Sequence, residues 1–163
     1  MTRTWSQRPL EERALFNPAF MARIVRAAAE GYSREATEGL PFPLAFLVPP
    51  IVLHRPTRVA LPRAITTNLL VWLDQNAYLR QTFPARARAV LGAGREGLVV
   101  GLASGLISRE RARIVAPPLP RRKPGLFSTS QTEEILARAL FVGRWFARSG
   151  DVATIYAQWG VKP

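Results

Sequence analysis

SQTEEILARALFVGRWFARSGDVATIYAQWG, residues 130–160, contains the two clearest helix patterns of the chain. Ser130 and Glu133 have the spacing of a capping box, and apolar side chains then recur at helical intervals as far as Gly150. Asp151 is placed to cap a second helix, whose apolar positions fall at i, i+3, i+4 and i+7. The stretch predicts a pair of amphipathic helices. Its own domain is the favoured packing partner for their apolar faces, and a second protein is the alternative.

The N-terminal part predicts two helices and a buried apolar segment. Asn17 and Pro18 form a cap followed by a proline at the first helical position, and apolar side chains then follow at helical spacing until Gly31. A shorter helix is predicted over residues 6–15. Residues 43–53, PLAFLVPPIVL, are too few to cross a bilayer, which takes about 20 residues. We interpret them as buried core, either as a helix kinked at the proline pair or as an extended segment.

The middle of the chain predicts three short helices followed by a wing. Pro62 opens the first helix, the second spans residues 82–91, and Gly92-Ala93-Gly94 separates it from a third at residues 95–104. Residues 106–115 and a proline-rich basic loop then follow. This order of elements is typical of a helix-turn-helix with a β wing.

Together these patterns predict a mainly α protein, organised as one compact helical domain over residues 1–163 with a winged-helix-like central part. A chain of 163 residues with 48% apolar residues is large enough to bury one core. Within the domain, residues 1–60 provide the N-terminal helices and the buried apolar segment. Residues 61–127 form the basic winged-helix-like part, and residues 128–163 form the C-terminal helical pair.

The net charge of +12 is concentrated in residues 80–123, where ten basic and two acidic residues account for +8 of it. Clustered arginine is typical of contact with a polyanion, although an arginine-rich composition or an acidic protein partner also explains it. The candidate recognition helix, GREGLVVGLASGL, lacks base-reading side chains, so a contact with double-stranded DNA would involve backbone phosphates. The side chains predicted for this contact are Arg109, Arg111, Arg113, Arg121, Arg122 and Lys123.

Two further sets of residues are candidates for a contact with a partner protein. Gly97, Gly101 and Gly105 lie four residues apart and form a smooth helix face that another backbone can approach. Arg144 and Trp145 are residue types enriched at interface hot spots. For the glycines the alternative is packing within the chain's own fold, and this alternative is favoured. In the second set, Phe146 is expected to face the core, and Arg144 or Trp145 is expected to be exposed.

The residue inventory predicts no catalytic centre. The chain has no cysteine and one histidine, His54, and no carboxylate near it in the sequence could orient it as a general base. We therefore expect a structural histidine, no metal and no cofactor. The charged N-terminus lacks the apolar run of a signal peptide, and no apolar segment is long enough to span a membrane, which predicts a cytoplasmic location.

Five sequence blocks, taken in order, resemble the middle-component family of three-component ABC-ATPase (ABC-3C, Lamassu-like) systems. The blocks are WSQRPLEERALFNPAF, LPFPLAFLVPPIVLH, Thr57-Arg58 with Leu61-Pro62, Arg95-Glu96-Gly97-Leu98, and GRWFARSGDVATIYAQWGVKP. Together they extend over most of the chain.

The resemblance implies a non-catalytic adaptor subunit of a bacterial antiphage system. Its partners would be an SMC-like coiled-coil ABC ATPase and a separate effector subunit, which in related systems is often a nuclease. The subunit would bind the ATPase and the DNA backbone, and would help to couple DNA sensing to release of the effector. The alternative, suggested by the order of the basic elements, is a free-standing winged-helix transcriptional regulator. An enzyme is a more distant third interpretation.

Overall fold

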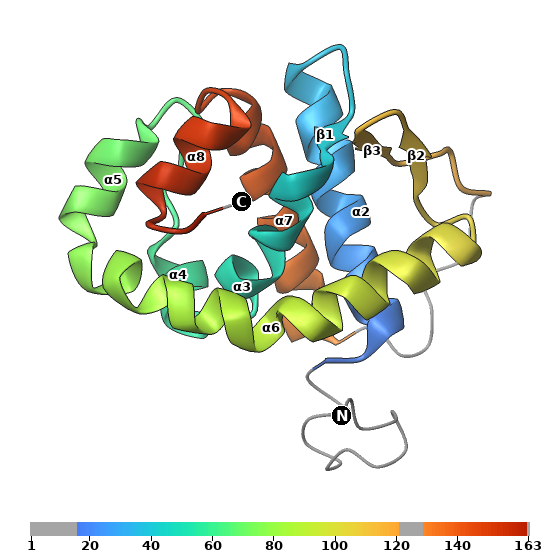
Figure 1. The fold of residues 1–163 in the computed structure, drawn as a ribbon, viewed down its shortest axis with the longest axis horizontal. Helices are drawn as coiled ribbons and strands as arrows, with labels where there is room; N and C mark the ends of the chain where they lie inside the picture. The colour runs from blue at the N-terminus through green and yellow to red at the C-terminus, as the bar shows by residue number, and fades with distance from the viewer. Residues whose placement is uncertain (1–15, 121–128, 163) are drawn as a thin grey trace.

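The computed structural model describes residues 16–120 and 129–162. Within these residues the protein has seven α-helices, one 3₁₀-helix and a small antiparallel sheet (Figure 1). The mainly α class predicted from the sequence is confirmed. In chain order the elements are α2 (Pro18–Glu35), β1 (Leu40–Pro41), η2 (Phe42–Phe46), α3 (Val48–Val52), α4 (Arg55–Ala60), α5 (Leu69–Gln75), α6 (Ala77–Ala103), β2 (Ser108–Glu110), β3 (Arg113–Val115), α7 (Ser130–Ala147) and α8 (Val152–Gln158).

The helices α2 and α7 pack closely against each other in the middle of the molecule, and α6 crosses α2 (Figure 1). The closest approach of α2 and α7 is at two glycines. A Cβ on Gly31 would overlap the carbonyl oxygen of Leu140, and a Cβ on Gly143 would overlap the carbonyl oxygen of Ala28. Only glycine therefore fits on either side of this helix crossing.

The start of α2 agrees with the sequence pattern, and its end does not. The side chain of Asn17 accepts a hydrogen bond from the N–H of Ala19 at 2.9 Å, and Pro18 is the first helical residue, as predicted. The helix then continues to Glu35, beyond its predicted end at Gly31. The glycine is needed for the contact with α7, so it does not mark the end of the helix.

The C-terminal helical pair is present, with one change in its capping. The capping box of α7 consists of Thr129 and Thr132, whose side chains each accept a hydrogen bond from the other residue's backbone N–H. The predicted box of Ser130 and Glu133 is wrong by one residue. Asp151 caps α8 as predicted, by accepting a hydrogen bond from the backbone N–H three residues later at 2.7 Å.

The apolar run at residues 43–53 is helical and largely buried, which confirms its assignment to the core. Of the two structures that fit the sequence, the helical one is found, as η2 followed by α3. Pro49 and Pro50 lie in the first turn of α3, where a proline removes no helical hydrogen bond. The predicted kink is therefore not needed.

Pro62 does not open a helix, and that prediction is wrong. Residues 61–68 are irregular, and α5 begins after Asn68, whose side chain accepts a hydrogen bond from the N–H of Val71 at 3.1 Å. Indole N–H groups hold this connection at both ends. Trp72 donates to the carbonyl of Ala60 at 3.0 Å. Trp145 of α7 donates to the carbonyl of Thr67 at 2.7 Å.

The predicted break at Gly92-Ala93-Gly94 is also wrong, because α6 is one continuous helix of 27 residues that includes Pro84. A proline inside a helix costs about 3 kcal/mol and a glycine about 1 kcal/mol relative to alanine. Packing against α2, α3 and η2 offsets these costs, since α6 buries Phe83, Val90 and Leu98. The helix-turn-helix predicted for this region consequently does not form.

A β-hairpin follows α6 in the segment predicted as the wing. Its strands β2 and β3 pair antiparallel, and β1 adds to β3 with Leu40 opposite Ile114, which gives the strand order β1-β3-β2 (Figure 1). Arg26 of α2 fixes both ends of the hairpin by donating to the carbonyls of Leu106 at 2.6 Å and Pro117 at 2.7 Å. The strands of a wing are present, but the winged-helix arrangement is not confirmed. The helix predicted over residues 6–15 lies outside the described residues.

Candidate partner-binding groove

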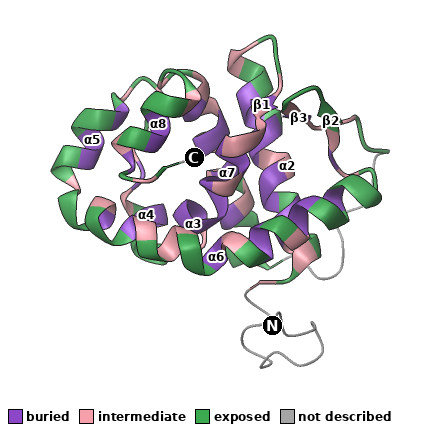
Figure 2. Cartoon of the chain, in the orientation of Figure 1, coloured by how far each residue is buried: buried purple, intermediate pink, exposed green. Residues whose placement is uncertain are grey.

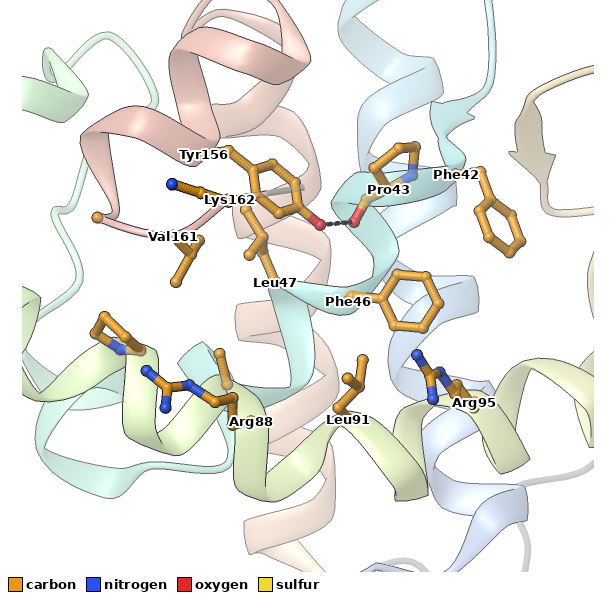
Figure 3. Close-up of a pocket in the computed structure, with 13 residues that line it drawn as sticks. Phe42, Pro43, Phe46, Leu47, Arg88, Leu91, Arg95, Tyr156, Val161 and Lys162 are labelled. Atoms are coloured by element: carbon orange, nitrogen blue, oxygen red, sulfur yellow. Dashed lines mark hydrogen bonds between the residues drawn. The ribbon is translucent and has the colours of Figure 1, made fainter.

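A groove with a volume of about 690 Å³ lies between α6, η2 and the C-terminal end of α8 (Figure 3). Its lining is mostly apolar, and three basic side chains are included. The lining residues are Phe42, Pro43, Phe46 and Leu47 from η2 and the start of α3, Pro84, Ala87, Arg88, Leu91 and Arg95 from α6, and Tyr156, Gly160, Val161 and Lys162 from α8 and the residues after it.

Contacts between elements hold the walls of the groove in place. The hydroxyl of Tyr156 donates to the carbonyl of Pro43 at 2.6 Å and so connects α8 to η2 (Figure 3). Burial raises the pKa of Tyr156, which keeps this hydroxyl protonated as a donor. Phe42 and Phe46 pack edge to face with ring centroids 5.6 Å apart. On α6, Gly94 faces the ring of Phe46, and a Cβ added there would lie in ordinary van der Waals contact with it at 3.7 Å.

The charge of the groove has one sign. Arg88, Arg95 and Lys162 are exposed at its edges, and none of its lining residues is an aspartate or glutamate. Within the described parts of the chain, none of these three cations forms an ion pair. Figure 3 shows Leu91 between the two arginines along α6. The groove therefore combines an apolar surface with uncompensated positive charge.

The exposed face of α6 extends the groove toward the hairpin. Arg88, Leu91, Arg95, Val99 and Leu102 follow one another at intervals of three or four residues, which places them on one side of the helix. Val99 is 66% exposed and Leu102 is 39% exposed. These five residues, together with Pro84 at the start of the same face, are called the α6 stripe below. Green bands along α6 in Figure 2 mark its exposed positions.

Two of the three glycines predicted as a partner interface, Gly97 and Gly101, pack inside the fold. A Cβ on Gly97 would lie 2.5 Å from the Cβ of Met21 in α2, and one on Gly101 would lie 2.9 Å from a side-chain carbon of Ile107. Both glycines are buried, so the intramolecular alternative is the correct one for them. Gly105 lies beyond the end of α6 with a φ of +72°, a conformation that favours glycine in a turn.

The pair Arg144 and Trp145 is also occupied by contacts within the chain. Trp145 is completely buried, so its predicted role in a partner interface is wrong. Arg144 is 37% exposed and is paired with Glu35 of α2 at 2.6 Å, and Arg148 approaches the same carboxylate at 3.5 Å. These ion pairs join α7 to α2.

Three of the six side chains predicted to contact nucleic acid, Arg109, Arg111 and Arg113, belong to the hairpin. Arg109 and Arg111 are exposed on it, and Arg111 adopts a φ of 56° at the turn. Arg113 differs from them, because it pairs with Glu38 at 2.5 Å and donates to the carbonyl of Gly39 at 2.9 Å, which gives it a structural role. Arg121, Arg122 and Lys123 lie outside the described residues.

His54 has the structural surroundings expected for it. Its Nδ1 caps α4 by accepting a hydrogen bond from the N–H of Thr57 at 3.3 Å, and it lies 2.7 Å from the hydroxyl of the same residue. Burial lowers the pKa of His54, and the nearby positive charge of Arg86 lowers it further. Among the residues that the structure describes, no three His, Asp or Glu side chains are grouped so that they could hold a metal ion.

The sequence patterns did not identify the groove, although they contained part of the signal. Leu91 was expected at the end of a helix and Arg95 at the start of another, which divided the α6 stripe. The residues of the α6 stripe nevertheless keep intervals of three or four residues from Pro84 to Leu102, across Gly92 and Gly94. The other wall, with Phe42, Phe46 and Val161, depends on contacts between distant segments and has no local pattern.

None of the helices in residues 16–120 and 129–162 is both long and apolar enough to cross a membrane. Comparison with known protein families gives a match: the family model described as ABC-three component (ABC-3C) system Middle Component 3 matches residues 5–163. No curated protein and no solved structure gives a significant match. The matched range contains all five sequence blocks that resemble middle components. The chain therefore belongs to the Middle Component 3 family of ABC-three component systems.

Proposed function

We propose that this protein is a non-catalytic adaptor subunit that binds the SMC-like ABC ATPase of its system through the groove. The observation that carries the proposal is the groove itself, an apolar cavity of about 690 Å³ with three uncompensated cations. Membership of a family of ABC-three component middle components supports an ABC ATPase as the partner. In this proposal the subunit couples the ATPase to a separate effector in antiphage defence, within the cytoplasm.

A role in binding also agrees with how the candidate catalytic side chain is used. The Nδ1 atom of His54 accepts a helix-capping hydrogen bond. The Nδ1 lone pair is therefore already used in the hydrogen bond that caps the start of α4. A general base would need that lone pair free for a substrate proton.

A second, weaker contact is proposed for the hairpin. Arg109 and Arg111 are exposed there, and we assign them to the DNA backbone. In this contact the two hairpin arginines would neutralise phosphates without reading bases, so it would add affinity and no sequence preference. The free-standing regulator is less well supported, because the helix-turn-helix on which it depended is replaced by the continuous helix α6.

Co-purification tests the proposed function. The chain is co-expressed with the products of its flanking genes and isolated through an affinity tag, with and without nuclease treatment to remove bridging DNA. Recovery of a large ATPase in both preparations is the expected result. Loss of the ATPase after nuclease treatment would show that the two proteins associate only through DNA, which would contradict a direct adaptor role. Recovery of no ATPase in either preparation would overturn the proposal.

A further inference from the structure

The shape of the groove favours a helical occupant. Its walls are α6, η2 and the end of α8, and no strand of the described sheet contributes to its lining. A partner strand would need an unpaired sheet edge, whereas an amphipathic helix needs an apolar groove with helical walls. The α6 stripe runs from Pro84 to Leu102, which at 1.5 Å per residue is about 27 Å. This length matches about five turns of a partner helix.

The charges of the groove specify the polar side of that helix. Arg88 and Arg95 are seven residues apart, so they lie about 10.5 Å from each other along α6. Carboxylates seven residues apart on a helix aligned with α6 have the same spacing and would meet both arginines. Leu91 lies between the arginines and would contact an apolar side chain between the carboxylates (Figure 3). Lys162 adds positive charge at another edge of the groove.

A second copy of this chain is a poor occupant on electrostatic grounds. The chain has a net charge of +12, and the groove has no acidic lining residue. Two such molecules repel each other, and a basic segment would add like charge beside Arg88 and Arg95. The occupant is therefore expected to come from a different subunit and to be acidic.

We propose that the groove and the α6 stripe bind an amphipathic α-helix of a partner subunit that presents carboxylates at positions i and i+7 to Arg88 and Arg95, with apolar residues between them. This inference rests on the proposed function, because it specifies the segment by which the ATPase is held. It adds the chemical class of the segment, which the family match does not supply.

Charge reversal in the co-expressed complex tests the inference. The double variant Arg88→Glu/Arg95→Glu is compared with Arg55→Glu/Arg63→Glu, which makes the same change of charge at exposed positions away from the groove. We expect at least a roughly tenfold loss of affinity for the ATPase in the groove variant and little change in the control. Circular dichroism of both variants establishes that each remains folded. Equal affinities in a complex that still forms would overturn the inference and the use of the groove, and would leave the proposed role as an adaptor subunit intact.

Photo-crosslinking identifies the bound segment directly. A benzoylphenylalanine in place of Leu91 is activated in the purified complex, and the linked peptide is sequenced by mass spectrometry. A peptide with helical apolar spacing and acidic residues seven apart supports the inference. A basic peptide, an extended strand or a second copy of this chain overturns it, even when the ATPase is recovered. Failure of the wild-type chain to recover any ATPase rejects the proposed function and this inference together.

Discussion

Individual side chains set the boundaries and connections of the short helix α4. His54 caps its start, Thr57 is fully buried in its first turn, and Arg58 is only 2% exposed. The guanidinium of Arg58 donates to the carbonyl of Val52 at 2.7 Å and reaches Glu134 of α7 at 3.4 Å. The sequence shows these residues as a conspicuous His-Arg-Pro-Thr-Arg run. It does not show which of them are buried, because burial depends on α3 and α7.

Protonation of His54 should destabilise the fold at acidic pH. Its folded-state pKa lies below the ordinary value of 6.5, so the unfolded state binds the proton more readily. The stabilisation is complete above about pH 6.5 and is lost as the pH falls through that value to the folded pKa. His54→Asn keeps a capping acceptor that does not titrate. Urea unfolding from pH 5 to 8 should show a smaller loss of stability in acid for His54→Asn than for the wild type, and identical curves would contradict this.

The buried bond of Arg58 should matter more than its ion pair. Arg58→Met removes a charged hydrogen bond to a buried carbonyl and should lower the free energy of unfolding by about 2 kcal/mol. Glu134→Gln affects only a half-exposed partner and should change that free energy by less than about 1 kcal/mol. Chemical denaturation of both variants measures the difference. Equal losses would assign the stabilisation to the ion pair instead.

At the level of elements, the sequence predicted most helices and misplaced several of their boundaries. The helix starting at Pro18 and the C-terminal pair followed from caps and apolar spacing, which are local signals. Gly31 and Gly92-Ala93-Gly94 were interpreted as ends of helices because a local pattern cannot distinguish a terminating glycine from one inside a helix. Gly31 allows the close approach of α7, and Gly94 lies inside α6 and faces the ring of Phe46. Both contacts are between segments far apart in the chain.

Adding a methyl group at the α2–α7 crossing should be strongly destabilising. The Cβ of Gly143→Ala would overlap the carbonyl oxygen of Ala28, so the two helices must move apart, at a cost of about 3 kcal/mol or more. Gly92→Ala is the matched control, because no atom lies within 4 Å of its added Cβ and alanine is the better helix former. Thermal unfolding should show a lower midpoint for Gly143→Ala and an unchanged or higher midpoint for Gly92→Ala. Equal midpoints would contradict the close crossing.

For the whole molecule, the excess of basic residues at positions 80–123 was evident in the sequence, and its division among sites was not. Arg88 and Arg95 lie at the groove, whereas Arg109 and Arg111 lie on the hairpin. Arg113 is neutralised by Glu38 within the fold. A count of charges along the chain cannot separate these environments, because it contains no information about which residues the fold brings together.

DNA binding should depend on the hairpin if the second proposed contact is correct. The plot of log K against log salt concentration has a negative slope, whose size increases with the number of phosphate contacts. Removing two contacts in Arg109→Gln/Arg111→Gln should make this slope less steep by about two. Arg55→Gln/Arg63→Gln removes the same charge elsewhere on the surface and should leave the slope nearly unchanged. Fluorescence anisotropy with random duplexes at several salt concentrations measures both variants. Equal reductions would indicate a diffuse attraction with no hairpin contact.

The bond between Tyr156 and Pro43 holds α8 against η2, and the residues after α8, Val161 and Lys162, are part of the lining of the groove. A peptide fused after Pro163 is joined to Lys162 through a single residue, so it can reach the groove without diffusing from solution. Its effective concentration there would be in the millimolar range for a short flexible connection. If the groove binds the ATPase as proposed, a carboxylate-rich epitope tag after Pro163 acts as a tethered competitor, whereas a neutral tag of the same length does not.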